Sequence, residues 1–177
     1  GVPVPLGLVV GRLDVFEPPE FEFAVAATTA TAATTSAAAT QRALVDQVRG
    51  RMVVSYDPNL RLNVEPDLAV WRETLEWMLA RTDVLKLSDE DLGLLYPGID
   101  PAAFAADCLG KGAGLVALTR GGKGAFAWHA SGSVDVPPVA VDVIDTVGAG
   151  DTFQASLLTR LDELGARVAR ALAADYA

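Results

Sequence analysis

The sequence predicts an α/β fold in which a mostly parallel β-sheet has helices on both faces. Short apolar runs alternate along the chain with longer segments whose apolar residues recur at helical spacing. Polar or glycine-containing loops follow several of these apolar runs. Hydrophobic residues make up 51% of the 177 residues and aromatic residues only 7%, so we expect a core of Ala, Val and Leu. This length predicts a single domain over residues 1–177.

The first part of the chain gives the weaker structural signals. Leu6 to Val10 predicts a strand. Segment 24–40 is of low complexity and rich in Ala and Thr, which leaves both a helix and a disordered segment open. From Gln41 the pattern clears and predicts a helix that ends near Gly50. The short apolar run from Met52 to Ser55 predicts a buried strand.

The second part alternates more regularly. An amphipathic helix is expected from about Asp67 to Arg81, because its apolar residues recur at helical spacing. Ser88 is expected to cap the next helix, since three acidic residues follow it. The remaining expected elements are a strand at 84–87, a helix at 101–109, a strand at 115–119 with a hairpin partner at 124–129, a strand at 139–144, and a helix from Phe153 to Leu158.

Polar loops follow four of the expected strands. They lie at residues 57–59, 86–88, 119–121 and 145–151. In open α/β sheets, ligands bind at the carboxyl ends of the strands. The sequence therefore predicts a binding site made from these loops at one edge of the sheet.

The segment from Asp145 to Phe153, DTVGAGDTF, is the most informative of these loops. Its glycines allow close approach of backbone N–H groups, and the following helix start favours an anion such as phosphate. A carboxylate such as Asp151 repels phosphate unless it has a role, for example accepting a proton from an attacking hydroxyl. The alternative is that Asp145 and Asp151 cap a helix and the glycines only turn the chain.

Charge and composition exclude several function classes. The formal net charge of −9 argues against nonspecific binding to nucleic acid or to an anionic membrane. Cys108 is the only cysteine, so an intrachain disulfide is excluded and a core position is expected for it. His129 is the only histidine, which excludes a mechanism that needs two. No secretory signal is visible and segment 24–40 is too weakly hydrophobic for a membrane span, so we expect a cytoplasmic protein.

The four loops together resemble the ribokinase-like sugar kinases, also called the PfkB family. DTVGAGDTF closely matches the C-terminal signature of that family, and DPNLR at 57–61 resembles a segment common in its fructokinase and 2-keto-3-deoxygluconate kinase branches. DVLKLS at 83–88 and LTRGGKG at 118–124 resemble its central strand and its nucleotide-side loop. The resemblance covers roughly Gln41 to Leu158 and implies a three-layer α/β/α fold.

The resemblance implies a kinase that transfers the γ-phosphoryl group of ATP to a sugar hydroxyl. By position, Asp151 would activate the acceptor hydroxyl. The backbone N–H groups of Gly148, Ala149 and Gly150 would face the transferring phosphoryl group. ATP and Mg²⁺ are the implied cofactors, together with a monovalent cation such as K⁺. The implied partners are a small sugar, ATP and a second copy of the chain in a homodimer.

Other residues would bind the nucleotide, the sugar and the metal ion. Thr119, Gly121 and Gly124 would line the nucleotide, although their loop also fits an ordinary left-handed turn between strands. Lys86 would reach a phosphate, or else be a solvated lysine at a strand end. The residues implied to contact the sugar are Asp14, Asn59 and Arg61. Arg61 also has a salt bridge to a neighbouring carboxylate as its alternative.

The sequence departs from the family pattern at two points. Many relatives have Asn-x-x-Glu where this chain has Ser88 and Asp91, so that Asp91 would act on magnesium only indirectly, through water. The Gly-Gly sugar-binding segment and the β lid of the family are not found, so the single domain looks incomplete. A truncated or decayed member that binds nucleotide or a partner without catalysis therefore remains the alternative to a kinase. A Rossmann oxidoreductase is disfavoured, because no acidic ribose-binding residue follows the glycines.

Overall fold

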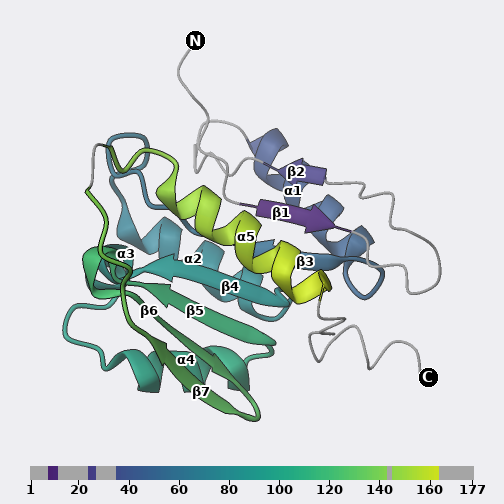
Figure 1. Ribbon diagram of the computed structural model, residues 1–177. Coiled ribbons are helices and arrows are strands. Elements are labelled where there is room, and N and C mark those ends of the chain that lie inside the picture. Colours follow the sequence, from purple (N-terminus) through teal and green to yellow (C-terminus); the bar gives the residue numbers. More distant parts are fainter. Residues whose placement is uncertain (1–7, 12–23, 27–34, 143–144, 164–177) are drawn as a thin grey trace.

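The computed structural model describes residues 8–11, 24–26, 35–142 and 145–163 (Figure 1). The strands are β1 (Leu8–Gly11), β2 (Ala24–Ala26), β3 (Val53–Tyr56), β4 (Val84–Ser88), β5 (Leu115–Thr119), β6 (Ala125–His129) and β7 (Gly132–Val136). The helices are α1 (Thr35–Val48), α2 (Leu68–Leu79), α3 (Asp89–Leu95), α4 (Pro101–Gly110) and α5 (Ala149–Glu163), with a 3₁₀ turn at Gly121–Lys123.

The described strands form one seven-stranded sheet in the order β2-β1-β3-β4-β5-β6-β7. The pairs β3–β4 and β4–β5 are parallel, whereas all the other pairs are antiparallel. The sheet is therefore mixed, and the expected parallel arrangement is confined to its centre. Connection length explains the difference: helical crossovers separate β3, β4 and β5, while short loops join β5 to β6 and β6 to β7 as hairpins.

Helices cover both faces of the sheet, which gives the three layers that the sequence predicts (Figure 1). One face packs on α1, α2, α3 and α4 through alternating residues such as Val54, Leu85 and Val116. The opposite face, here called the α5 face, presents Val53 and Val84 to leucines of α5. Because side chains alternate along a strand, Ser55 and Lys86 belong to the α5 face as well.

Several sequence predictions are confirmed in the core. The predicted helices near 41–50, 67–81 and 101–109 correspond to α1, α2 and α4. Cys108 is fully buried on α4, where burial raises the pKa of its thiol to about 12. His129 is the last residue of β6. None of the described helices has the length and apolar character that crossing a bilayer requires.

Two predicted elements differ from the structure. In segment 24–40, β2 and the start of α1 are formed, and residues 27–34 lie outside the described part. The predicted strand at 139–144 is wrong where it is described, because residues 137–142 have no regular structure and 143–144 lie outside. Pro137 and Pro138 lack the N–H groups that a strand needs, and Val139 is 82% exposed. The sequence analysis missed β7, which precedes these prolines.

Candidate active site

The carboxyl ends of β3, β4 and β5 lie at one edge of the sheet, here called the strand-end rim. Their parallel pairing places the loop that begins at Asp57, the start of α3 at Asp89 and the loop that begins at Arg120 on the same side. The fourth predicted loop joins this rim through α5, whose first turn approaches β4: a Cβ atom added to Gly150 would lie 2.8 Å from Nζ of Lys86. Three of the predicted loops therefore meet at this rim, while residues 86–88, also predicted as a loop, are the last residues of β4.

A buried ion pair lies at the centre of the strand-end rim. Nζ of Lys86 is 2.6 Å from Oδ2 of Asp57, and the two side chains are 6% and 3% exposed. The alternative of a solvated Lys86 is therefore wrong. Because the ammonium group also lies against Gly150, it is held between the β3 carboxylate and the start of α5. Gly150 leaves room for the ammonium group, and a side chain at this position would clash with it.

The loop after β3 is organised around Asp57. Its Oδ1 accepts a hydrogen bond of 3.1 Å from the backbone N–H of Asn59, which adopts a left-handed φ of 45°. Burial raises the pKa of Asp57, and Lys86 opposes this with its charge and hydrogen bond. The charge of Asp151 also raises the pKa of Asp57, which shows that the two carboxylates share one electrostatic environment.

Asp91 joins the same environment from α3. Ser88 caps this helix, as predicted, since its Oγ accepts a 3.0 Å hydrogen bond from the N–H of Asp91. Burial raises the pKa of Asp91, and the charge of Asp57 acts in the same direction. Hydrogen bonds from Ser88 and from the Leu60 backbone oppose that shift, as does the charge of Lys86. Asp91 thus ties the loop after β3 to the start of α3.

The glycine-rich segment forms a tight turn followed immediately by α5. Oδ1 of Asp145 accepts a 3.0 Å hydrogen bond from the N–H of Val147, so this carboxylate stabilises the turn before α5 and does not cap the helix itself. Gly148 has a φ of 75°, which favours glycine. The helix begins at Ala149 rather than at Phe153, because the small residues of the turn already wind into its first turn. Asp151 is therefore an exposed first-turn residue beside the helix N-terminus.

First-turn N–H groups of a helix have no acceptor in a preceding turn. The N–H of Thr152 donates to the carbonyl oxygen of Gly148 at 2.9 Å, and that of Ala149 donates to Thr146 at 3.1 Å. Between them lie the N–H groups of Gly150 and Asp151. Together with the helix dipole and the buried Lys86 ammonium, they make the start of α5 suited to an anion.

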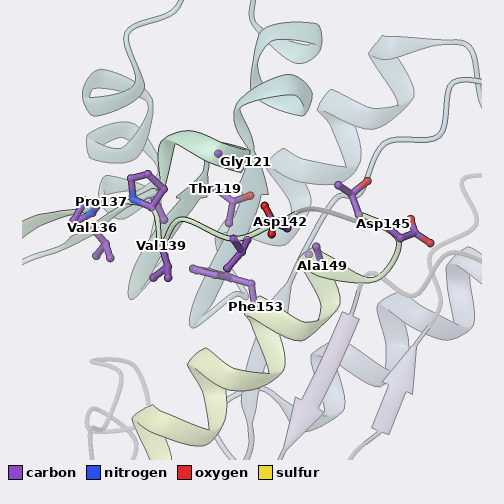
Figure 2. A pocket seen from close by; sticks show the side chains of 16 residues that line it. Thr119, Gly121, Val136, Pro137, Val139, Asp142, Asp145, Ala149 and Phe153 are labelled. Carbon is purple, nitrogen blue, oxygen red and sulfur yellow. The ribbon is translucent and has the colours of Figure 1, made fainter.

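A cavity of about 780 Å³ adjoins this helix start (Figure 2). Its volume is in the range of small-molecule sites. Figure 2 shows Thr119 and Gly121 on one side of it and Ala149 and Phe153 on another. The residues that line it are Thr119, Gly121, Gly122, Gly124, Ala125, Val136, Pro137, Pro138, Val139, Val141, Asp142, Asp145, Thr146, Ala149, Gly150 and Phe153.

Gly124 shapes one wall of this cavity by allowing two backbone segments to approach. Its φ is 88°, and a Cβ atom there would lie 2.0 Å from the carbonyl oxygen of Val136. Gly121 also has a positive φ, of 51°, so the left-handed turn that was kept as an alternative is present. The turn and the cavity are compatible, because the same loop that joins β5 to β6 also lines the cavity.

Gly124→Ala is expected to lower the free energy of unfolding by about 2 to 4 kcal/mol, since it adds both backbone strain and a clash with main-chain atoms. Urea unfolding of both proteins measures the difference. Gly122→Ala is the matched control, because open space surrounds that position and its φ is ordinary. It should change stability by no more than about 0.5 kcal/mol. Equal effects of the two substitutions would contradict this account of Gly124.

Two of the three residues predicted to contact the sugar lie in the described part of the chain. Arg61 donates from Nη1 to the carbonyl oxygens of Leu60 at 2.8 Å and Asn59 at 3.3 Å. Its guanidinium therefore braces its own loop, and among the described residues no carboxylate forms the salt bridge that was the alternative. Asn59 is half-buried in the same loop. Asp14 lies outside the described residues.

One polar contact near the site was missed by sequence reasoning. The side chain of Gln154 on α5 donates a 2.8 Å hydrogen bond to Oγ of Ser55 on β3, and both residues are buried. The signal in the sequence was a long polar side chain in the otherwise mostly apolar run from Phe153 to Leu158. Its partner could not be identified without the packing of α5 on the sheet.

The described residues contain no group of three or more His, Cys, Asp or Glu side chains placed to hold a metal ion. Mg²⁺ in phosphoryl-transfer sites is commonly bound by phosphate oxygens and water with only one or two carboxylates. Asp91 is a half-buried carboxylate at the strand-end rim, and its indirect contact with magnesium stays a prediction.

Comparison with known proteins identifies related chains. The sequence profile of the pfkB family carbohydrate kinases matches residues 20–174. A fructokinase from Rhizobium leguminosarum bv. trifolii is 41% identical over 119 residues, which cover 67% of this chain and 36% of the relative. A fructokinase from Vibrio alginolyticus is 34% identical, over 61% of this chain and 35% of its own length. The chain thus spans about a third of the length of these curated relatives.

Solved structures give the same result. A PfkB protein from Polaromonas sp. JS666 superposes with a TM-score of 0.62 at 29% identity, covering 81% of this chain and 46% of its own. A fructokinase from Vibrio cholerae O395, solved with fructose, ADP and calcium bound, gives a TM-score of 0.61 at 32% identity, covering 72% and 42%. Because the family profile matches most of its residues and these folds agree, the chain belongs to the pfkB family of carbohydrate kinases.

Proposed function

We propose that this chain carries the phosphoryl-transfer site of an ATP-dependent sugar kinase of the fructokinase type. The observation that supports it best is the start of α5, which lies against the buried Lys86–Asp57 pair and beside a cavity of nucleotide size. Phosphoryl transfer depends mainly on positioning and on charge stabilisation, and this arrangement offers both.

Asp151 is proposed as the base that accepts the proton of the sugar hydroxyl. It is exposed at the rim, so an acceptor can reach it, and it lies within the same helical turn as the anion-binding N–H groups. The N–H groups of Gly148, Gly150 and Asp151 would face the transferring phosphoryl group. That of Ala149, predicted for the same role, donates instead to the carbonyl oxygen of Thr146. One residue therefore supplies the base while its neighbours stabilise the charge.

The nucleotide is proposed to occupy the cavity that Thr119, Gly121 and Gly124 line. Lys86 would act on its phosphates from beneath Gly150, as a buried positive charge rather than as a flexible surface ligand. Its pairing with Asp57 keeps that ammonium group in a fixed place. The proposal keeps the predicted assignment of Lys86 to the nucleotide site. It adds that Lys86 acts from its buried position between Asp57 and Gly150.

The remaining assignments complete the proposal. Mg²⁺ would be held by the phosphates, by water and indirectly by Asp91, and would neutralise charge on the transferring group. A monovalent cation such as K⁺ and the sugar contacts of Asp14, Asn59 and Arg61 follow the family resemblance. We further propose a cytoplasmic homodimer that acts on a small sugar without binding nucleic acid or membranes, in line with the net charge of −9.

A coupled assay of ADP release tests the proposed function. ATP and Mg²⁺ would be supplied with fructose, 2-keto-3-deoxygluconate, ribose, adenosine or no acceptor. The proposal predicts ADP release that depends on a sugar, with fructose the leading candidate. Release that is equal with and without every acceptor would contradict it. ATP binding by calorimetry without any turnover would instead support the alternative of a non-catalytic nucleotide-binding member.

A further inference from the structure

A buried hydrogen bond joins α5 to the sheet one helical turn after Asp151. Nε2 of Gln154 donates to Oγ of Ser55 at 2.8 Å, across 99 positions of sequence. The two residues are only 3% and 0% exposed. Buried polar side chains are retained at a cost unless they are paired, so this bond is a defined feature of how the helix sits on the α5 face.

The apolar contacts of α5 with the sheet are of a different kind. Leu157, Leu158 and Leu161 pack on Val53 and Val84, all through apolar surface. Apolar contacts have no directional preference and allow a helix to slide or rotate. These leucines also lie in the second half of the helix, away from the strand-end rim. A hydrogen bond, in contrast, requires a narrow range of distance and angle.

The first turn of α5 needs such a directional contact. Gly150 has no side chain with which to anchor the helix, and Asp151 is exposed. A helix that slips by one residue moves along its axis by about 1.5 Å and turns by about 100°. Displacement of a catalytic group by about 1 Å can reduce a rate by about 100-fold. The register of α5 therefore decides in which direction Asp151 points from the strand-end rim.

We infer that Gln154 and Ser55 are positioning residues that fix the register of α5, and with it the direction of Asp151 and of the first-turn N–H groups. The expected effect on turnover rests on the proposed function. The claim that the bond between Gln154 and Ser55 fixes the register of α5 does not depend on it. A purely structural pair on this face would be replaceable by two apolar residues, because removing both partners leaves no buried polar group unpaired.

The test uses the double variant Ser55→Ala/Gln154→Met, which replaces the pair by apolar groups of similar shape. Ser156→Ala is the matched control, because Ser156 is an exposed serine on the same helix. Three quantities are measured for each protein: the midpoint of thermal unfolding, the hydrogen exchange of amides 149–153, and kcat and KM for ATP. Ser55→Thr is the conservative variant, since it keeps an acceptor hydroxyl.

The inference predicts a double variant whose midpoint stays within about 4 °C of the wild type. Its amides 149–153 should exchange about 10-fold faster, because the helix start is no longer held. Its kcat should fall by about 30-fold or more with KM for ATP within threefold, whereas Ser55→Thr, which keeps an acceptor for Gln154, should have wild-type exchange and kcat. Unchanged exchange at 149–153 would overturn the inference. A wild type without sugar-dependent transfer would count against the proposed function only, since the exchange comparison does not require turnover.

Discussion

Asp151→Asn is expected to lower kcat for sugar phosphorylation by about 1,000-fold, because general base catalysis is worth roughly 100- to 10,000-fold. The asparagine amide fills the same space but cannot accept the proton of the attacking hydroxyl. Its N–H group in the first turn of α5 is unchanged, so nucleotide affinity should stay within about threefold. Steady-state ADP release and calorimetric titration with ATP measure the two quantities on the same protein.

The control for this substitution is Glu163→Gln, which removes a carboxylate from the exposed last residue of the same helix. It changes the net charge by the same amount but lies far along α5 from the strand-end rim, so kcat should stay within about twofold. Weakened ATP binding with retained turnover in Asp151→Asn would contradict the role of base. It would instead place the carboxylate among the groups that hold the nucleotide.

Lys86→Met is expected to lower the free energy of unfolding by about 3 to 5 kcal/mol, because it leaves a buried carboxylate without its partner. Asp57 is only 2% exposed, so water cannot replace the 2.6 Å contact between its carboxylate and Nζ of Lys86. Denaturant unfolding at pH 7 measures the effect. The double variant Lys86→Met/Asp57→Asn should recover most of the loss, since it no longer buries an unpaired charge.

The same substitution has an expected pH dependence. Burial raises the pKa of Asp57, and Lys86 is the largest influence that opposes the rise. Without Lys86 the folded state keeps the proton of Asp57 at pH values where the unfolded chain has lost it. Stability then falls as pH rises above the carboxyl pKa of the unfolded chain, about 3.9, until the folded carboxyl also ionises. The loss caused by Lys86→Met should therefore be greater at pH 8 than at pH 5.

Lys111→Met is the control for the lysine substitution. Lys111 pairs with Glu76 at 2.9 Å and Asp107 at 2.7 Å, but its side chain is 39% exposed. Surface pairs of this kind contribute about 0 to 1 kcal/mol. If Lys86→Met and Lys111→Met had equal effects, the buried pair would not be the structural centre of the rim that the geometry indicates.

The parts of the fold that could be predicted are those in which the sequence pattern and the packing agree. The α2 helix was predictable because Trp71, Leu75, Met78 and Leu79 recur at helical spacing and all four are buried. The strand predicted at 139–144 failed because a valine-rich run was given more weight than the two prolines before it. Apolar residues alone do not make a strand when the backbone donors are missing and the side chains are exposed.

In the candidate site, too, the features that could be predicted were those that the local sequence pattern specifies. Its loops could be placed together because parallel strands end at one edge, and the glycine-rich segment specified its own turn. The pairing of Asp57 with Lys86 depends on the adjacency of β3 and β4, which the order of the strands suggested but did not prove. The bond between Gln154 and Ser55 could not be predicted, since it depends on the docking of α5 across 99 positions of sequence.

Nucleotide mapping by amide chemical shifts would test the central claim most directly, because it locates the phosphate and base sites without requiring turnover. The isotope-labelled chain would be titrated with Mg²⁺ and a non-hydrolysable ATP analogue. The largest shifts are expected at residues 119–124 and 148–152, which surround the cavity and begin α5. Shifts confined to other parts of the chain, such as the turn between β6 and β7, or no binding at all, would contradict the proposed site.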